Sequence, residues 1–197
     1  MTNRIWWGAL ALLVAGCAKD GTTRAPTMPM EVRTPLFAID HDANNIGTHL
    51  NGETEVPARA TLAQGQAIFR ISDDGQSVDY KLIASNIDNV FMAHIHSGPV
   101  TTPSGPIVVW LYPSTTPVPG PLGSGRHDGI LSEGTFTAAN LVGPLKGHPL
   151  SDLLVLMRTG NAYVNVHTND GVDGLNTGPG DFPGGEIRGG LAAPGKN

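Results

Sequence analysis

Apolar and polar residues alternate with a period of two along most of the chain that follows residue 45. In Gln66–Ser72 and again in Ser77–Ala84, every second side chain is apolar, which is typical of a strand with one face in a core. The intervening Asp73-Asp74-Gly75 is a turn signal, because these residues readily adopt tight-turn conformations. The two stretches therefore predict a β-hairpin.

Three further stretches complete the predicted elements. Pro106–Tyr112 is apolar on both faces, which predicts a central strand, and Gly129–Thr137 predicts another strand. Ser151–Thr159 has leucines at helical spacing, with Ser151 as the expected N-cap and Gly160 as the stop. Together the pattern predicts an all-β fold, an antiparallel β-sandwich or barrel-like domain of the Greek-key type, with one short helix.

Three strand-like stretches pair an apolar face with a row of ligand-type or charged residues. These rows are Tyr163, Asn165 and His167 in Gly160–Thr168, His94 and His96 in Phe91–His96, and Glu186 and Arg188 in Gly185–Gly189. Such residues suggest a partly buried polar face, where each group needs a specific partner. We hypothesise that the three rows converge on one site.

His94, His96 and His167 form a candidate metal site. Residues i and i+2 of a strand lie ~6.6 Å apart on the same face, so His94 and His96 could share one ion, with His167 as the third ligand. Three nitrogens suit copper or zinc. Glu186 or Glu55 could add a ligand or a supporting hydrogen bond. Acid is expected to release the ion as the imidazoles protonate near ~6.5.

Two alternatives use the same residues without a metal. In the first, the polar cluster is a structural hydrogen-bond network that sets strand register, in a non-enzymatic module that binds a protein or another ligand through loops 113–125 and 169–184. In the second, a lesser alternative, the protein is a redox enzyme. The His-x-His spacing is similar to that of Cu/Zn superoxide dismutase, but the wider ligand pattern and the disulfide of that family are absent. We assign no catalytic residue and favour a non-enzymatic role.

The first sixteen residues have the pattern of a bacterial lipoprotein signal peptide. Arg4 is basic, Ile5–Val14 is an apolar run too short to span a membrane, and Leu13–Cys17 resembles a lipobox. Cys17 is the single cysteine of the chain. We therefore expect it to become the lipidated N-terminus, which would hold the protein on a membrane. Ala18 resembles the outer-membrane sorting pattern.

The remaining chain divides into a tether, a domain and a tail. Residues 17–45 are rich in Thr and Pro and lack a hydrophobic repeat, residues 46–192 form the predicted domain, and 193–197 are expected to be disordered. The 26 Gly and 16 Pro imply short strands joined by turns. A net charge of −5 without a basic cluster argues against nucleic acid as a partner. Expected partners are the membrane, through the lipid on Cys17, and a metal or protein ligand.

Several of these stretches together resemble the CHRD domain, the module named for chordin. The matching blocks are Leu50-Asn51-Gly52, Glu55-Val56-Pro57, Ala93–His96, Gly105–Val109, Gly160–Thr168 and Gly184–Gly189. The resemblance implies an all-β domain outside the cytoplasm without an assigned activity. From the resemblance and the lipobox together, we expect a protein of the bacterial cell envelope, lipid-anchored at the outer membrane and facing the periplasm or the cell surface.

The lipobox generates a direct prediction. The mature protein should begin at a lipid-modified Cys17, because signal cleavage at a lipobox leaves the acylated cysteine first. Mass spectrometry of the N-terminal peptide measures this. An unmodified Cys17, or a different first residue, would mean that residues 17–45 are an ordinary linker.

Overall fold

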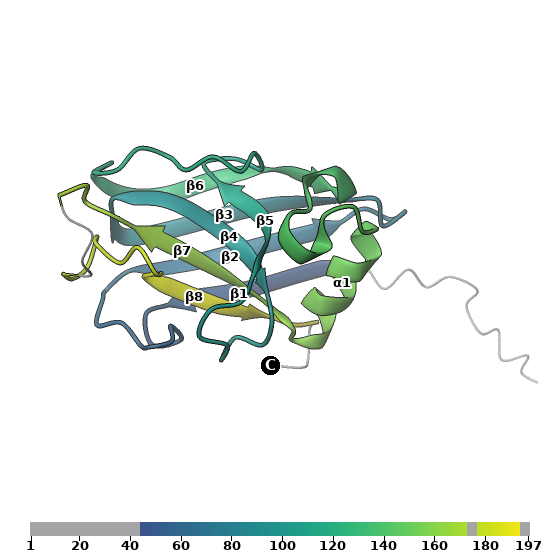
Figure 1. The fold of residues 1–197 in the computed structure, drawn as a ribbon, viewed down its shortest axis with the longest axis horizontal. Coiled ribbons are helices and arrows are strands. Elements are labelled where there is room, and N and C mark those ends of the chain that lie inside the picture. The colour runs from purple at the N-terminus through teal and green to yellow at the C-terminus, as the bar shows by residue number, and fades with distance from the viewer. Residues whose placement is uncertain (1–43, 173–176, 194–197) are drawn as a thin grey trace, which may run out of the picture. The chain divides into compact units, whose positions relative to one another are not determined.

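The computed structural model describes residues 44–172 and 177–193, which contain one antiparallel sheet of eight strands and one α-helix (Figure 1). The strands are β1 (Asn45–Asn51), β2 (Gln64–Ile71), β3 (Ser77–Asp88), β4 (Val90–Ser97), β5 (Ile107–Tyr112), β6 (Arg126–Thr137), β7 (Ala162–Thr168) and β8 (Ile187–Leu191). The helix α1 spans Leu150–Thr159, and two 3₁₀ turns, η1 (Ala138–Asn140) and η2 (Gly143–Leu145), precede it.

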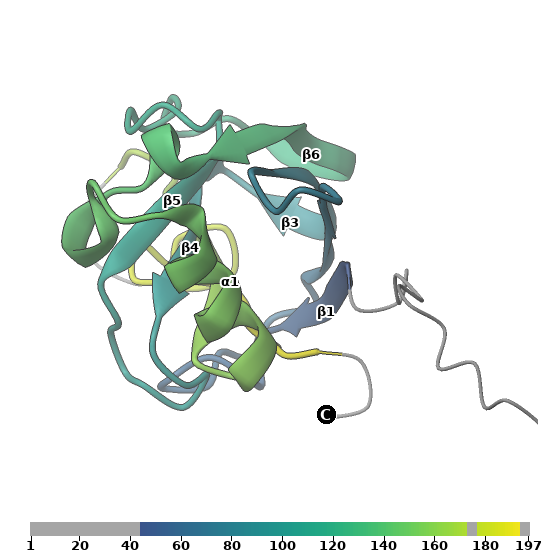
Figure 2. The ribbon, with the colours of Figure 1, turned by 90° about the vertical axis from the view of Figure 1, so that its right-hand side faces the viewer.

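The strand order is β5-β4-β7-β8-β1-β2-β3-β6. After the β1-β2-β3 meander, β4 crosses to the other half of the sheet, β6 returns beside β3, and β7 returns beside β4, which is a Greek-key arrangement. A single residue pair, Asn51 with Arg188, connects β1 to β8. The sheet curls until its end strands β5 and β6 approach each other, which makes a nearly closed barrel with α1 across one end (Figure 2). The predicted all-β, barrel-like fold with one short helix is confirmed.

The barrel interior is filled by the alternating apolar residues of all eight strands. Its fully buried side chains include Phe69, Leu82, Ile95, Val109, Val164, Val166 and Ile187. Helix α1 adds four buried side chains, Leu150, Leu153, Leu154 and Met157. Burying a side chain of this size contributes about 1.5–3 kcal/mol, so the interior supplies the main stabilisation of a chain whose single cysteine excludes an intramolecular disulfide.

The predicted start of the helix is wrong by one residue. Helix α1 begins at Leu150, its N-cap is Pro149, and no side chain caps it. The Pro149 carbonyl accepts from Asp152 N at 3.1 Å, and the side chain of Leu150 is buried. The first turn of the helix therefore includes Leu150. Gly160 ends the helix as predicted, because its φ of 81° lies in the left-handed region that glycine adopts without a steric penalty.

Strand β5 is not central, although Pro106–Tyr112 is apolar on both faces. It lies at one end of the hydrogen-bonded order, and β6 lies at the other. The two ends approach each other, and the Tyr80 and Ser132 hydroxyls both donate to the Leu111 carbonyl at 2.8 Å. The chain before η2 also covers β5, since Val142 N donates to Val108 O at 2.9 Å. Closure of the barrel therefore buries β5 without a second strand partner.

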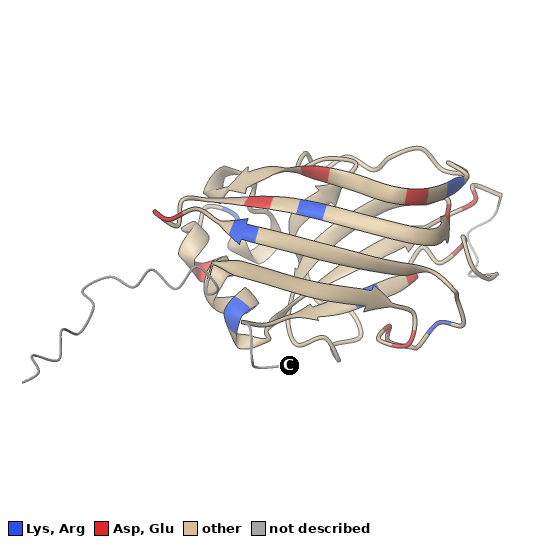
Figure 3. Cartoon of the chain, turned by 180° about the vertical axis from the view of Figure 1, so that it is seen from behind, with Lys and Arg blue, Asp and Glu red and all other residues tan. Residues whose placement is uncertain are grey.

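The outer side of β2, β3 and β6 carries interspersed acidic and basic residues (Figure 3). Lys81 and Glu133 form an ion pair there at 3.1 Å, and both side chains are about half exposed. Exposed pairs of this kind contribute little to stability. This face has the mixed charge of an ordinary solvated sheet.

The structure leaves the N-terminal predictions outside the described residues. The proposed signal peptide, Cys17 and all but the last two residues of the tether fall before residue 44. Strand β1 begins at Asn45, one residue before the predicted domain start. Between residues 44 and 193, excluding 173–176, no helix is long and apolar enough to cross a membrane.

The hydrogen bonds that join β3 and β6 to Leu111 of β5, here called the seam, generate a stability prediction. Tyr80→Phe should lower the free energy of unfolding by about 0.5–1.5 kcal/mol, because one hydrogen bond is lost. Tyr80→Phe combined with Ser132→Ala should cost more than the sum of the single changes, since the Leu111 carbonyl then loses both side-chain donors.

Urea unfolding of the two single variants and the double variant measures this coupling. Tyr112→Phe is the matched control, because within the described residues the Tyr112 hydroxyl makes no hydrogen bond. Strictly additive costs would contradict the shared-acceptor account of the seam.

Candidate metal centre

The register of β4 against β7 brings the three histidines together. Met92 is opposite His167, His94 is opposite Asn165, and His96 is opposite Tyr163. The alternate residues of β4 and β7 point into the barrel: Ala93, Ile95, Val164 and Val166. The histidines therefore lie on the outer side of this half of the sheet. Loop segments of residues 98–106 and 177–186 cover them, and their exposed fractions are only 0 % for His94 and 7 % for His96 and His167.

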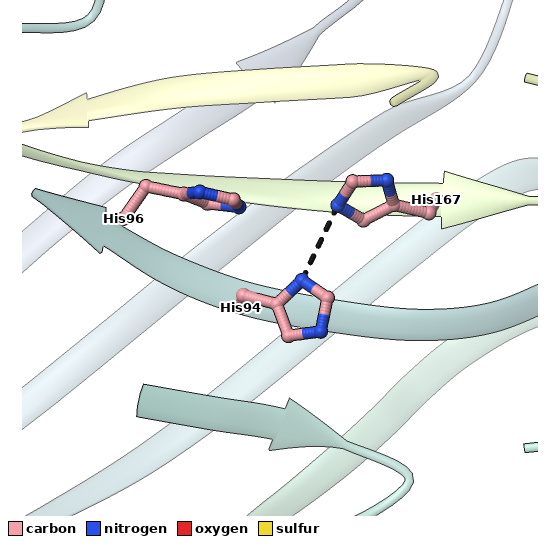
Figure 4. Close-up of side chains that lie close together, drawn as sticks. All are labelled: His94, His96 and His167. Carbon is pink, nitrogen blue, oxygen red and sulfur yellow. Dashed lines mark hydrogen bonds between the residues drawn. The ribbon is translucent and has the colours of Figure 1, made fainter. Parts of the chain in front are cut away.

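The three rings lie close together, and one nitrogen of His94 points toward a nitrogen of His167 (Figure 4). One ligand atom from each ring lies within 4.8 Å of the other two. His96 Nδ1 lies 2.7 Å from Gly105 O, and His167 Nδ1 lies 2.8 Å from Pro183 O. A carbonyl can only accept, so both Nδ1 atoms carry the proton and both Nε2 atoms keep a lone pair. His94 Nδ1 lies 3.3 Å from His167 Nε2 and therefore donates to it.

Burial keeps all three imidazoles neutral. It lowers the pKa from 6.5 to about 2 for His94, about 4 for His96 and about 3 for His167. Repulsion from the neighbouring imidazoles lowers the pKa of His94 further, and the Arg188 charge contributes to the lowering for His96 and His167. The expected protonation near 6.5 is therefore wrong for the folded protein, and the rings stay competent as ligands in mild acid.

Aromatic rings form two walls of the cluster. The Trp110 ring lies edge-on to His94 with centroids 4.2 Å apart, and the Tyr163 ring stacks on His96 at 4.9 Å. The Tyr163 hydroxyl accepts from Gly105 N at 2.9 Å, so the residue that orients His96 is itself anchored to β7. A Cβ at Gly105 would clash with Ser97 O, which explains the glycine at this position.

Arg188 links the cluster to two loops. Its guanidinium pairs with Glu55 at 2.9 Å, donates to Thr102 O at 2.7 Å, and lies 4.4 Å over the Tyr163 ring. Asn165 Nδ2 donates to the other Glu55 oxygen. Burial raises the pKa of Glu55 to about 6 against the lowering effect of Arg188, so the pair is charged at neutral pH. Removing either partner would leave a buried charge, at a cost of about 3–5 kcal/mol.

Glu186 does not join this cluster, although the predicted strand Gly185–Gly189 placed it beside Arg188. Strand β8 begins at Ile187, after Gly185 with a φ of 123°. The carboxylate instead accepts from the Thr61 and Thr168 hydroxyls at 2.6 and 2.7 Å and from Gly180 N at 2.9 Å. Glu186 lies before the first residue of β8, where strand alternation no longer sets the direction of a side chain. The predicted shared face of Glu186 and Arg188 is therefore wrong.

Glu55, and not Glu186, is the acidic side chain that lies beside Arg188 and Asn165. A Cβ at Gly185 would lie 2.6 Å from Glu55 Oε1, so the glycine is needed for Glu55 to approach Asn165. Among the proposed supporting residues, Tyr163, Asn165, Glu55 and Arg188 thus surround the histidines. Within residues 44–172 and 177–193, the three histidines are the only group of at least three His, Cys, Asp or Glu with this ligand spacing.

Some residues of the site carried no readable sequence signal. Trp110 faces His94 only because β5 pairs with β4 in the observed register. The carbonyls of Gly105 and Pro183 orient two rings, but every residue has a carbonyl, so side-chain patterns cannot indicate them. Such contacts depend on loop conformation.

Comparison with known proteins identifies the domain. A family model described as the CHRD domain matches residues 46–191, a range that contains every residue of the cluster. No curated protein and no solved structure matches the chain.

The buried histidines predict a loss of stability in acid for the metal-free protein. Between pH 6.5 and 5 the unfolded chain protonates three imidazoles that stay neutral in the fold, whereas Glu55 takes up about one proton in the fold. The net excess of about two protons in the unfolded state lowers stability by about 2–3 kcal/mol per pH unit.

Chemical denaturation of metal-free protein at pH 7, 6 and 5 measures this slope. His167→Gln should reduce this slope by the contribution of about one proton, because the unfolded chain then has one imidazole fewer to protonate. A stability that stays level from pH 7 to 5 would contradict the burial of neutral imidazoles.

Proposed function

The chain belongs to the CHRD domain family, and from this premise we propose that its domain binds one copper or zinc ion through His94, His96 and His167. The observation that carries the proposal is the orientation of two rings. His96 and His167 each donate Nδ1–H to a backbone carbonyl, which leaves both Nε2 lone pairs in the cluster. A histidine that binds a metal is typically oriented in this way by its second nitrogen.

The distances fit a tetrahedral ion. Two nitrogens bound at ~2.0–2.1 Å to one such ion lie roughly 3.3–3.4 Å apart. His94 Nδ1 and His167 Nε2 already lie 3.3 Å apart, so an ion would replace the hydrogen bond between them, and His94 would then carry its proton on Nε2. The remaining separations are at most 4.8 Å, so metal binding would draw the rings closer together. The donors are three neutral imidazoles, which suit copper and zinc rather than magnesium or calcium.

Unpartnered nitrogens favour a metal over a purely structural network. Nε2 of His94 and Nε2 of His96 are buried and have no hydrogen-bond partner among the described residues. Leaving a buried polar atom unpaired costs about 1–3 kcal/mol, so a network selected for stability alone would pair them. An ion that takes His96 Nε2 removes one of these deficits.

A second candidate is a ligand-binding module whose polar cluster serves structure alone. The contacts of Arg188 favour it, because the ion pair with Glu55 and the bonds to loop carbonyls need no metal. In that case the cluster positions the loops, and the loops carry the function.

We also propose that the domain is exported and anchored to a bacterial envelope membrane through Cys17. The support is the charged, apolar and lipobox pattern of the first seventeen residues. Bound metal would then be exchanged outside the cytoplasm.

The metal proposal predicts a metal-dependent melt. Wild-type protein dialysed after loading should retain one equivalent of Cu²⁺ or Zn²⁺, and its stability should rise by about 2.7 kcal/mol at a free metal concentration of 100 Kd. His96→Ala should abolish retention and the shift, because one of three ligands is lost. Elemental analysis and thermal melts measure both effects.

His148→Ala is the matched control, since His148 is exposed and pairs with Asp152 at 2.8 Å outside the cluster. It should keep full metal retention. A wild-type melt indifferent to both metals, with no metal retained, would end the proposal. His96→Ala would then cost about 1–3 kcal/mol without metal dependence, as the structural candidate predicts.

A further inference from the structure

A cavity opens onto the histidine cluster from the outer side of the sheet. It has a volume of about 280 Å³, and its lining includes His96, His167, Tyr163, Arg188 and Ser104. His94 is not among the lining residues and is fully buried, whereas His96 and His167 each keep 7 % exposure. An ion held by the three rings would therefore meet this cavity on the side of His96 and His167.

We propose that the bound ion keeps one coordination position open to this cavity and takes a small anion there, such as hydroxide or azide. This inference rests on the proposed metal site. A site with three protein ligands and a fourth open position is the arrangement that admits an exogenous ligand. The proposal goes beyond metal retention, because it makes the site one that exchanges small ligands.

Within the part of the chain that the structure describes, the cavity wall lacks a suitable fourth protein ligand. Glu55 is held by Arg188 and Asn165, and the Tyr163 hydroxyl accepts from Gly105 N. Asn165 Oδ1 is unpartnered, but amide oxygens suit harder ions than copper or zinc. Glu186 already accepts three hydrogen bonds elsewhere. The fourth ligand therefore comes from solution.

Charge balance favours an anion. Three neutral imidazoles leave the two positive charges of the ion uncompensated, and the Arg188 charge is already balanced by Glu55. In a buried site an unbalanced charge is costly, so a negative ligand is preferred to a neutral one. The volume of about 280 Å³ is several times the ~30 Å³ of a water molecule, so an anion of three atoms fits.

Azide titration of the copper-loaded full-length protein tests the inference. Visible absorption and electron paramagnetic resonance should change saturably, as azide enters the coordination sphere of Cu²⁺. Ser104→Trp should weaken azide binding by at least about tenfold while copper is retained, because the indole fills the cavity. Ser104 is exposed, and its side chain makes no hydrogen bond within the described residues, so the fold should tolerate the change.

Thr101→Trp is the matched control, because Thr101 is exposed on the same loop and does not line the cavity. It should leave azide binding unchanged. Retained copper whose spectra ignore azide would overturn this inference and leave the metal site standing. Failure to bind copper would overturn both. Unaltered azide binding in Ser104→Trp would overturn the cavity as the route to the ion.

Discussion

The buried guanidinium of Arg188 is the interaction on which the arrangement of the site depends. It neutralises Glu55, stacks over Tyr163 and donates to the carbonyls of the 98–106 loop. A buried ion pair adds little net stability, because desolvation offsets most of its attraction. Its effect is on geometry, since the charge is satisfied only when β8, β7 and the two loops hold one specific arrangement.

Orientation of the histidines follows from those loops. The Arg188 contacts hold the loop that presents Gly105 O to His96, and Glu186 holds the segment that presents Pro183 O to His167. Two separate buried side chains thus position two carbonyls, and each carbonyl selects a tautomer. The same covering loops remove water from the rings, which lowers their pKa values and keeps their nitrogens available to an ion.

The apolar interior of the barrel and the polar cluster have different roles in this fold. Alternating apolar residues fill the interior and supply stability, while the outer face of β4 and β7 carries the chemistry under a cover of loops. The cluster therefore lies outside the main core but is nearly as buried as the core. This separation explains how ordinary β-strand alternation can place three imidazoles in one buried site without disturbing the apolar interior.

Patterns in the sequence by themselves predicted seven of the eight strands of the described residues, but not β1. Alternation also determined the shared face of His94 with His96 and of Tyr163, Asn165 and His167, because side-chain direction in a strand is local. It also showed Gly160 as the helix stop. Only the tertiary structure decided which strands are neighbours, and so that β5 closes the barrel and that Glu55 replaces Glu186 beside Arg188. Strand pairing and loop conformation depend on contacts between residues far apart in the chain, which a periodic pattern does not encode.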